Sequence, residues 1–107
     1  MQIQINTDHN IEGYEALAKY VRGVVESALS RFSEQITRVE VHVSDENGHK
    51  GGQNDKRCVM EARLEHHQPL AVTHHSATVG EAVNGASDKL IHSIESTLGR
   101  LRDQRSS

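Results

Sequence analysis

Two hydrophobic periods alternate along this chain, and their order limits the folds that the chain can adopt. Apolar side chains recur at every second residue near the N-terminus and again between residues 36 and 75, a pattern typical of strands with one buried face. Between these segments, and again towards the C-terminus, apolar residues recur at steps of three and four, which predicts amphipathic helices. The predicted order of elements is therefore β-α-β-β-β-α.

The pattern also predicts where each element begins and ends. Strands are expected over residues 2–7, 36–44, 57–66 and 70–75, and helices over residues 12–33 and over about 24 residues from Thr78. The apolar face of the first helix is predicted to consist of Tyr14, Leu17, Val21, Val24, Ala28 and Phe32. Gly23 costs this helix about 1 kcal/mol relative to alanine, so packing around it must compensate. Thr78 and Glu81 have the spacing of a capping box at the start of the last helix.

The length of 107 residues leaves room for one core, so residues 1–107 are expected to form a single domain. Two helices on one face of a four-stranded sheet would bury every apolar row, which predicts an α+β two-layer sandwich. The other face of the sheet must stay in water, because Glu40, Glu61, Arg63 and Glu65 project from it.

Several classes of protein are excluded by what the sequence lacks. No stretch approaches the roughly 18 consecutive apolar residues of a membrane helix, and the N-terminus does not resemble a secretory signal, so a cytoplasmic protein without a membrane partner is expected. Cys58 alternates with Met60 and Ala62 on a buried face, which predicts a structural thiol rather than a nucleophile. The aromatic residues, 3% of the chain, are too few for a sheet that stacks bases on aromatic side chains.

The eight histidines suggest a metal site, but their spacing argues against one. His66 and His67, like His74 and His75, are neighbours that would point to opposite faces of a strand. A tight turn near Pro69 would pair His74 with residues 61–63, too far from the first pair for one metal ion. The sequence also contains no GxxxxGK[ST] or GxGxxG loop and no nucleophile beside a base. We therefore expect no metal, cofactor or small-molecule substrate, and no enzymatic activity.

Basic residues remain as candidates for function, although the formal net charge is −3 with neutral histidines. They occur around the glycine-rich segment 45–56, on the exposed face of the sheet and on the last helix. The predicted RNA-binding residues are Lys50, Lys56, Arg57, Arg63, Lys89, Arg100 and Arg102. Flexible basic side chains can follow a phosphate backbone without stacking on bases, which favours recognition of RNA by its shape. This hypothesis requires the basic residues to form one electropositive track from the glycine-rich segment to the last helix. A solvated surface of mixed charge is the simpler interpretation.

Three groups of residues, together with the order of elements, resemble a known family. They are Ala16, Leu17, Ala18, Lys19, Tyr20 and Val21; Val39, Val41 and Val43; and Ala82, Val83, Asn84, Asp88, Lys89 and Leu90. Over about residues 2–103 the chain resembles the ribosome hibernation-promoting factor and ribosome-associated inhibitor family, also called sigma-54 modulation proteins, in its short form without a dimerising tail.

This resemblance implies a partner and a mode of action. Members of the family sit in the messenger and transfer RNA channel of the small ribosomal subunit, bind its ribosomal RNA and block translation in starved cells, which is a stress response. The last helix of the family carries a basic stretch where this chain has Lys89, Arg100 and Arg102. Its first helix typically carries lysines where this chain has Val24, Val25 and Ser27. The alternative hypothesis is a protein-binding module that keeps the fold but has lost ribosome binding.

Overall fold

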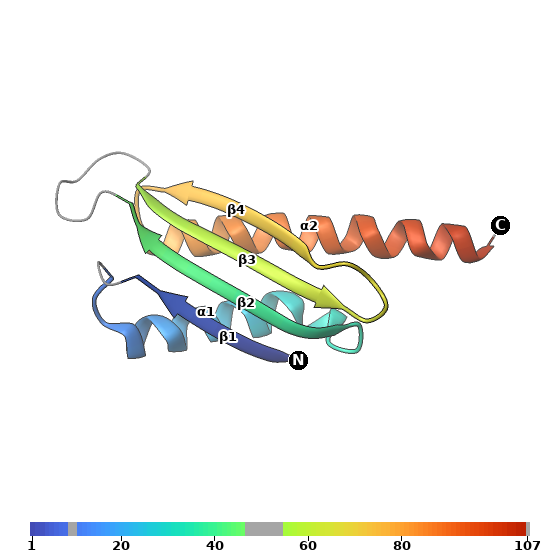
Figure 1. Cartoon of the computed structure of the whole chain (residues 1–107), viewed down its shortest axis with the longest axis horizontal. Helices are drawn as coiled ribbons and strands as arrows, with labels where there is room; N and C mark the ends of the chain where they lie inside the picture. The colour runs from blue at the N-terminus through green and yellow to red at the C-terminus, as the bar shows by residue number, and fades with distance from the viewer. Residues whose placement is uncertain (9–10, 47–54, 107) are drawn as a thin grey trace.

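The computed structural model describes residues 1–8, 11–46 and 55–106, except for the side chains of residues 103–106. The elements along the chain are β1 (Gln2–Thr7), α1 (Tyr14–Leu29), the 3-10 helix η1 (Ser30–Phe32), β2 (Ile36–Asp45), β3 (Lys56–Leu64), β4 (Leu70–Ser76) and α2 (Val79–Ser106), as Figure 1 shows. This order confirms the predicted β-α-β-β-β-α sequence of elements.

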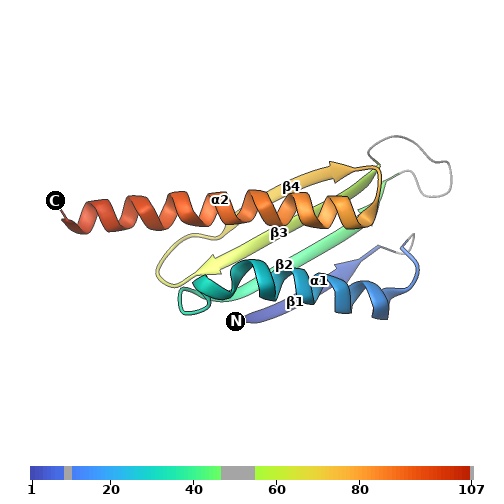
Figure 2. The ribbon, with the colours of Figure 1, turned by 180° about the vertical axis from the view of Figure 1, so that it is seen from behind.

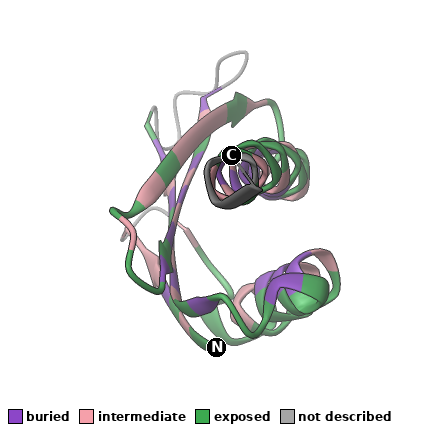
Figure 3. Ribbon diagram, turned by 90° about the vertical axis from the view of Figure 1, so that its right-hand side faces the viewer, coloured by how far each residue is buried: buried purple, intermediate pink, exposed green. Residues whose placement is uncertain are grey.

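The four strands form one sheet in the order β1-β2-β3-β4. The pair β1 and β2 is parallel, and the other two pairs are antiparallel. Parallel neighbours cannot be joined by a hairpin, so the chain crosses over between β1 and β2 through α1. Both helices lie on the same face of the sheet (Figure 2), and the view along the molecule shows them side by side against it (Figure 3). The predicted two-layer α+β sandwich is confirmed.

One core fills the space between the sheet and the two helices. The sheet contributes alternate residues of β2 and β3, and the helices contribute residues spaced by three or four. The buried apolar residues of the four elements are Ile36, Val39, Val41 and Val43; Cys58, Met60, Ala62 and Leu64; Val21, Val25 and Leu29; and Ala82, Val83, Ala86, Leu90 and Ile94. No helix within the described residues is both long enough and apolar enough to cross a membrane.

The buried face of α1 differs from the predicted one. Val21 and Phe32 are buried as expected, but the positions between them are Val25 and Leu29, whereas Val24 is only half-buried. Tyr14 was predicted to be in the core, yet 49% of it is exposed. Its hydroxyl donates a hydrogen bond to the carbonyl oxygen of Ile5 at 3.1 Å, so the side chain reaches the backbone of β1 instead.

The start of α2 forms half of the predicted capping box. The backbone N–H of Glu81 donates to Oγ1 of Thr78 at 3.1 Å, which satisfies one free donor of the first turn. The carboxylate of Glu81 accepts a hydrogen bond from Oγ of Ser76 at 3.0 Å rather than returning to Thr78. The helix runs for 28 residues, longer than the predicted length, because it continues past the end of the sheet (Figure 1).

The register of the β3–β4 hairpin corrects the prediction for His74. Its partner on β3 is Cys58, not a residue between 61 and 63, because the turn between the strands is wider than a tight turn and takes in His66, whose φ is 61°. Cys58 faces the core, so His74 also faces α2. There its ring lies so close to Gly85 that a Cβ on this glycine would be 2.1 Å from Cδ2 of His74.

Candidate nucleic-acid interface

The described members of the predicted RNA-binding set lie at three places on the molecule. Lys56 and Arg57 begin β3, at the end of the sheet where α2 also begins, and Arg63 lies near the other end of β3. Lys89 lies near the middle of α2, and Arg100 and Arg102 lie towards its end. Lys50 falls within residues 47–54, outside the described residues.

The arginines on the outer face of the sheet are paired with carboxylates. Nε of Arg57 lies 3.7 Å from Oε1 of Glu46, and Nε of Arg63 lies 3.4 Å from Oε1 of Glu61. Arg38 pairs with Glu40 at 2.7 Å. Exposed pairs of this kind add little stability, about 0–1 kcal/mol each, but they cancel the positive charge locally. The outer face is therefore a surface of balanced charge.

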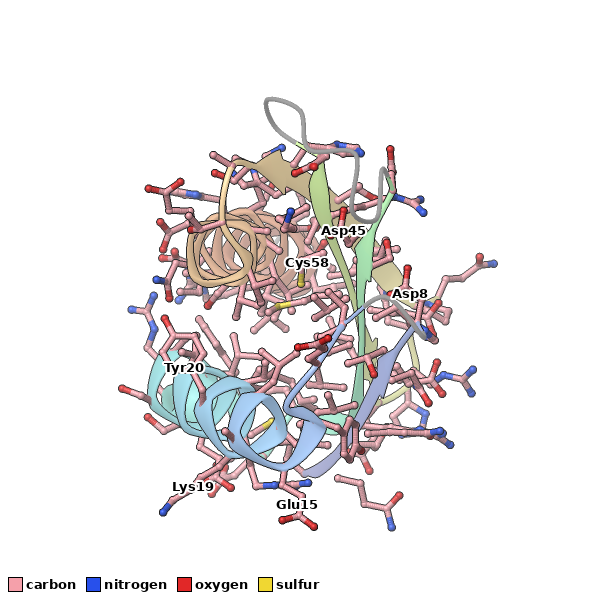
Figure 4. All side chains as sticks on the ribbon, turned by 90° about the vertical axis from the view of Figure 1, so that its left-hand side faces the viewer. Asp8, Glu15, Lys19, Tyr20, Asp45 and Cys58 are labelled. Carbon is pink, nitrogen blue, oxygen red and sulfur yellow. The ribbon has the colours of Figure 1, made fainter. Side chains whose placement is uncertain are left out.

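Lys56 is held by two buried carboxylates at the end of the sheet. Its Nζ lies 2.9 Å from Oδ1 of Asp55 and 3.3 Å from Oδ2 of Asp45. The side chain of Asp55 is only 2% exposed, and its other oxygen, Oδ2, has no hydrogen-bond partner among the residues that the structure describes. The hydrogen bond to Asp55 is the main reason why the pKa of Lys56 is raised; desolvation opposes it, and Asp45 adds to it. Lys56 thus neutralises acidic groups of its own chain (Asp45 is labelled in Figure 4).

Lys89 and Arg100 differ from these residues because their partners among the described side chains and carbonyl groups carry no charge. Nζ of Lys89 donates to the carbonyl oxygen of Thr73 at 2.9 Å. The guanidinium of Arg100 donates to Oγ of Ser96 at 3.1 Å and to Oγ1 of Thr97 at 3.4 Å. Neither side chain is therefore paired with a carboxylate that the structure describes.

The helical repeat places these two cations on one side of α2. They are separated by 11 residues, or three turns, which corresponds to about 16 Å along the axis. His92 and Ser96 lie between them on the same side and are exposed. We call Lys89, His92, Ser96 and Arg100 the α2 stripe; it contains no carboxylate. The acidic residues of this part of the helix, Glu81, Asp88 and Glu95, follow another side at seven-residue spacing.

The described cations do not form the predicted continuous track. About 32 Å of helix separates the start of α2, beside Lys56, from Arg100. Arg102 is two residues beyond Arg100 and therefore points to a different side of α2, where it lines a hollow with Phe32, Glu95 and Leu98. The predicted track is wrong for these residues, whereas their binding to RNA stays a prediction.

A groove between the two helices was not predicted from the sequence. It has a volume of 730 Å³, and its lining includes Tyr20, Val24 and Ala28 of α1 and Asn84, Ser87 and Asp88 of α2. We call it the interhelical groove. Nδ2 of Asn84 donates to the Tyr20 hydroxyl at 3.0 Å near one end, and Arg31 pairs with Glu95 at 3.3 Å towards the other. Two cross-helix contacts therefore flank this hollow.

Gly23 forms part of the wall of the interhelical groove, and its surroundings correct the expectation from the sequence. A Cβ at this position would meet nothing within 4 Å, and the residue is exposed. Packing therefore does not compensate for the cost of about 1 kcal/mol that glycine imposes on the helix. Gly23 is the sequence feature that lies at this groove, but a glycine inside a helix does not by itself predict one.

Cys58 is the buried structural thiol that the alternation predicted: it is 0% exposed, and Figure 4 shows it inside the molecule. Burial raises its pKa to about 12. The described residues contain no group of three or more histidine, cysteine or acidic side chains that could hold a metal ion.

This pKa predicts that the folded protein resists thiol reagents. At pH 8 we expect Cys58 to react with a disulfide reagent about 100-fold or more slowly in the native state than in urea, because the thiolate is the reactive form. The thiol ionises more readily in the unfolded chain, so stability should also fall as the pH rises above the ordinary value of 9.0. Equal reaction rates in both states would contradict the buried position.

The sequence of this chain matches a known family, and its fold matches known structures. The family model described as "Sigma 54 modulation protein / S30EA ribosomal protein" matches residues 3–102. The N-terminal domain of Protein Y from Thermus thermophilus is 20% identical, with a TM-score of 0.72 over 91% of this chain and 99% of that chain. A ribosomal subunit interface protein from Coxiella burnetii is 16% identical, with a TM-score of 0.71 over 92% and 99%. At these identities the two structures show the fold alone. A search of curated proteins found no match.

Proposed function

Because this chain belongs to the sigma 54 modulation protein / S30EA ribosomal protein family, we propose that it is a ribosome-associated factor that acts by binding and not by catalysis. In this proposal it binds ribosomal RNA of the small subunit in the cytoplasm and holds ribosomes idle under stress. The match over residues 3–102 confirms the family resemblance seen in the sequence. The Coxiella protein of similar fold is described as a ribosomal subunit interface protein, which is consistent with such a site.

The observation that carries the proposal is the charge of the α2 stripe. Lys89 and Arg100 lie about 16 Å apart along an exposed helix face, and neither is paired with a described carboxylate. Lysine and arginine at a surface contact phosphates directly, and such contacts supply most of the affinity of shape-based RNA binding. The long α2, which continues past the sheet, extends this face beyond the body of the domain (Figure 2).

The other predicted contacts have a secondary role in this proposal. Arg57 and Arg63 must exchange a carboxylate for a phosphate before they can bind RNA, and Lys56 must give up two. Each exchange lowers the net free energy gained on binding RNA, because the contact to phosphate that forms replaces a contact to carboxylate that is lost. Arg102 and Lys50 complete the proposed set.

Co-sedimentation with ribosomes tests the proposal directly. Cation–phosphate contacts release counterions, so we expect the affinity to fall by about tenfold or more between 50 and 200 mM salt if at least two such contacts form. Sedimentation with isolated small and large subunits identifies the subunit. A protein that fails to pellet with ribosomes at any salt concentration, or that pellets only with the large subunit, would overturn the proposal.

A protein-binding module is the second candidate, and the balanced charge of the outer sheet face favours it. On this face the pairs Arg38–Glu40 and Arg63–Glu61 leave no excess charge. Binding to a protein through that face would depend little on salt and would survive charge reversal at Arg100 and Arg102. Binding to RNA would be lost in the same variant.

A further inference from the structure

The two outer strands of the described sheet each have one side that no neighbouring strand covers. In the order β1-β2-β3-β4 these strands are β1 and β4. The backbone N–H and C=O groups along such an edge can pair with a strand of another molecule, so an open edge invites association between chains. The direction in which each backbone group points therefore shows where the sheet can be extended.

Alternate residues of β1 direct their backbone groups away from β2. The N–H of Asp8 donates to the carbonyl oxygen of Val43 on β2 at 3.2 Å, so the even-numbered residues of this segment face β2. The residues between them face the opposite way, because backbone groups alternate in direction along a strand. The carbonyl groups of Ile3 and Ile5 therefore point to the open edge.

The same reasoning identifies the outward groups of β4. The N–H of Glu46 donates to the carbonyl oxygen of Asp55 at 2.9 Å, so Asp55 and every second residue after it face β2. Cys58 then faces β4 and is paired with His74, which therefore faces β3. Thr73, the neighbour of His74, has its backbone groups on the open edge.

Two side chains of α1 cap the outward carbonyl groups of β1. The Tyr14 hydroxyl donates to the carbonyl oxygen of Ile5 at 3.1 Å. Nη1 of Arg22 donates to the carbonyl oxygen of Ile3 at 3.4 Å. The two acceptors are two residues apart, as neighbouring acceptors on one edge must be. Both donors therefore occupy positions that a pairing strand would need.

The open edge of β4 is capped in the same way from the other helix. Because α2 packs against β4 (Figure 2), Lys89 reaches this edge, where its Nζ donates to the carbonyl oxygen of Thr73 at 2.9 Å. We call Tyr14, Arg22 and Lys89 the edge caps. They come from two helices and reach both edges of the sheet.

We propose that the edge caps keep this chain monomeric by closing both edges of its sheet to a strand of a second copy. An incoming strand would have to displace a hydrogen-bonded donor at each capped carbonyl group. At Arg22 and Lys89 it would also have to exclude water from a charged group, which is costly. This inference does not depend on the proposed ribosomal function, although Lys89 belongs both to the edge caps and to the α2 stripe.

Self-association of the purified full chain, measured by sedimentation equilibrium without ribosomes, tests the proposal. Tyr14→Phe combined with Arg22→Met frees both carbonyl groups of β1 and keeps a large side chain at each position. One backbone hydrogen bond changes an association constant by about fivefold, so this variant should associate at least about tenfold more tightly than wild type. Lys89→Met should increase association through β4 by about fivefold.

Control variants make the same chemical changes away from the edges. They are Tyr20→Phe combined with Arg31→Met, and Lys19→Met, and all three residues are exposed. The Tyr20 hydroxyl accepts a hydrogen bond from Asn84, and Arg31 pairs with Glu95, so neither residue caps a strand through these contacts. Each control changes the net charge as its test variant does and should associate no more than wild type.

Hydrogen exchange locates the contact in the associated β1 variant. The amides of Ile3 and Ile5 should exchange about tenfold more slowly than in the control, whereas the amide of Gln4, which faces β2, should not change. If circular dichroism at 222 nm shows that the double variant is unfolded, Tyr14→Phe and Arg22→Met are tested singly, each with an expected increase of about fivefold.

Several outcomes would overturn the proposal. These are folded edge variants that associate no more than wild type, controls that associate as tightly as the edge variants, and association without slower exchange at the outward amides. A wild-type chain that already associates through either edge would overturn it as well.

Discussion

Changing both Lys89 and Arg100 to glutamate is expected to weaken binding to ribosomes by about 100-fold or more at low salt. Each residue is proposed to make a charge-assisted contact to phosphate, and each such contact is worth about 1.5–3 kcal/mol, so the loss of two corresponds to at least two orders of magnitude. The new carboxylates would add repulsion from the RNA. Sedimentation at a fixed salt concentration gives the affinity. In the same variant, the slope of log affinity against log salt concentration should become shallower by the amount that about two phosphate contacts contribute.

The sheet offers a control with the same change in net charge. Arg57→Glu combined with Arg63→Glu also lowers the charge by four, but it acts on arginines that already pair with Glu46 and Glu61. This variant should weaken binding by about tenfold or less, because fewer uncompensated charges are removed. The opposite ranking of the two variants would place the RNA on the outer face of the sheet and not along α2.

The order of the elements could be predicted because each strand and helix has its own hydrophobic period. Val39, Val41 and Val43 alternate with polar residues, and no helix accommodates that spacing on one face. The phase of α1 could not be predicted, because two sets of residues fit a helical face equally well. The spacing from Val21 through Val24 is as helical as the spacing through Val25, and only packing on the sheet selects Val25.

The candidate site was less predictable than the fold, because it depends on which residues the fold brings together. The pair of Arg63 with Glu61 follows from alternation on one strand, since residues two apart share a face. In contrast, Lys89 meets the carbonyl oxygen of Thr73 only because α2 packs across β4. The interhelical groove combines residues that are 64 positions apart at Tyr20 and Asn84, and no local pattern encodes such a contact.

Gly85→Ala is expected to destabilise the fold, although alanine is the better helix former. The added Cβ would lie 2.1 Å from Cδ2 and 2.3 Å from Nε2 of His74, so the imidazole must leave its place between β4 and α2 or the helix must move outwards. Overpacking of this kind costs about 1–3 kcal/mol, which exceeds the gain of about 1 kcal/mol in helix propensity. Urea unfolding followed by circular dichroism at 222 nm measures the difference.

Two further variants separate the close contact from a general effect of alanine in a helix. Gly23→Ala makes the same change in α1, where a Cβ meets nothing within 4 Å, and should stabilise the protein by up to about 1 kcal/mol. His74→Ala removes the obstructing ring, so Gly85→Ala should cost less stability in that background, or even stabilise the fold, if the two residues are coupled.

If Gly85→Ala moves α2 away from β4, this displacement should also break the hydrogen bond from Lys89 to Thr73, one turn further along the helix. Gly85→Ala would then also weaken ribosome binding while leaving every basic residue in place, and unchanged affinity would show that the α2 stripe works without its anchor on the sheet.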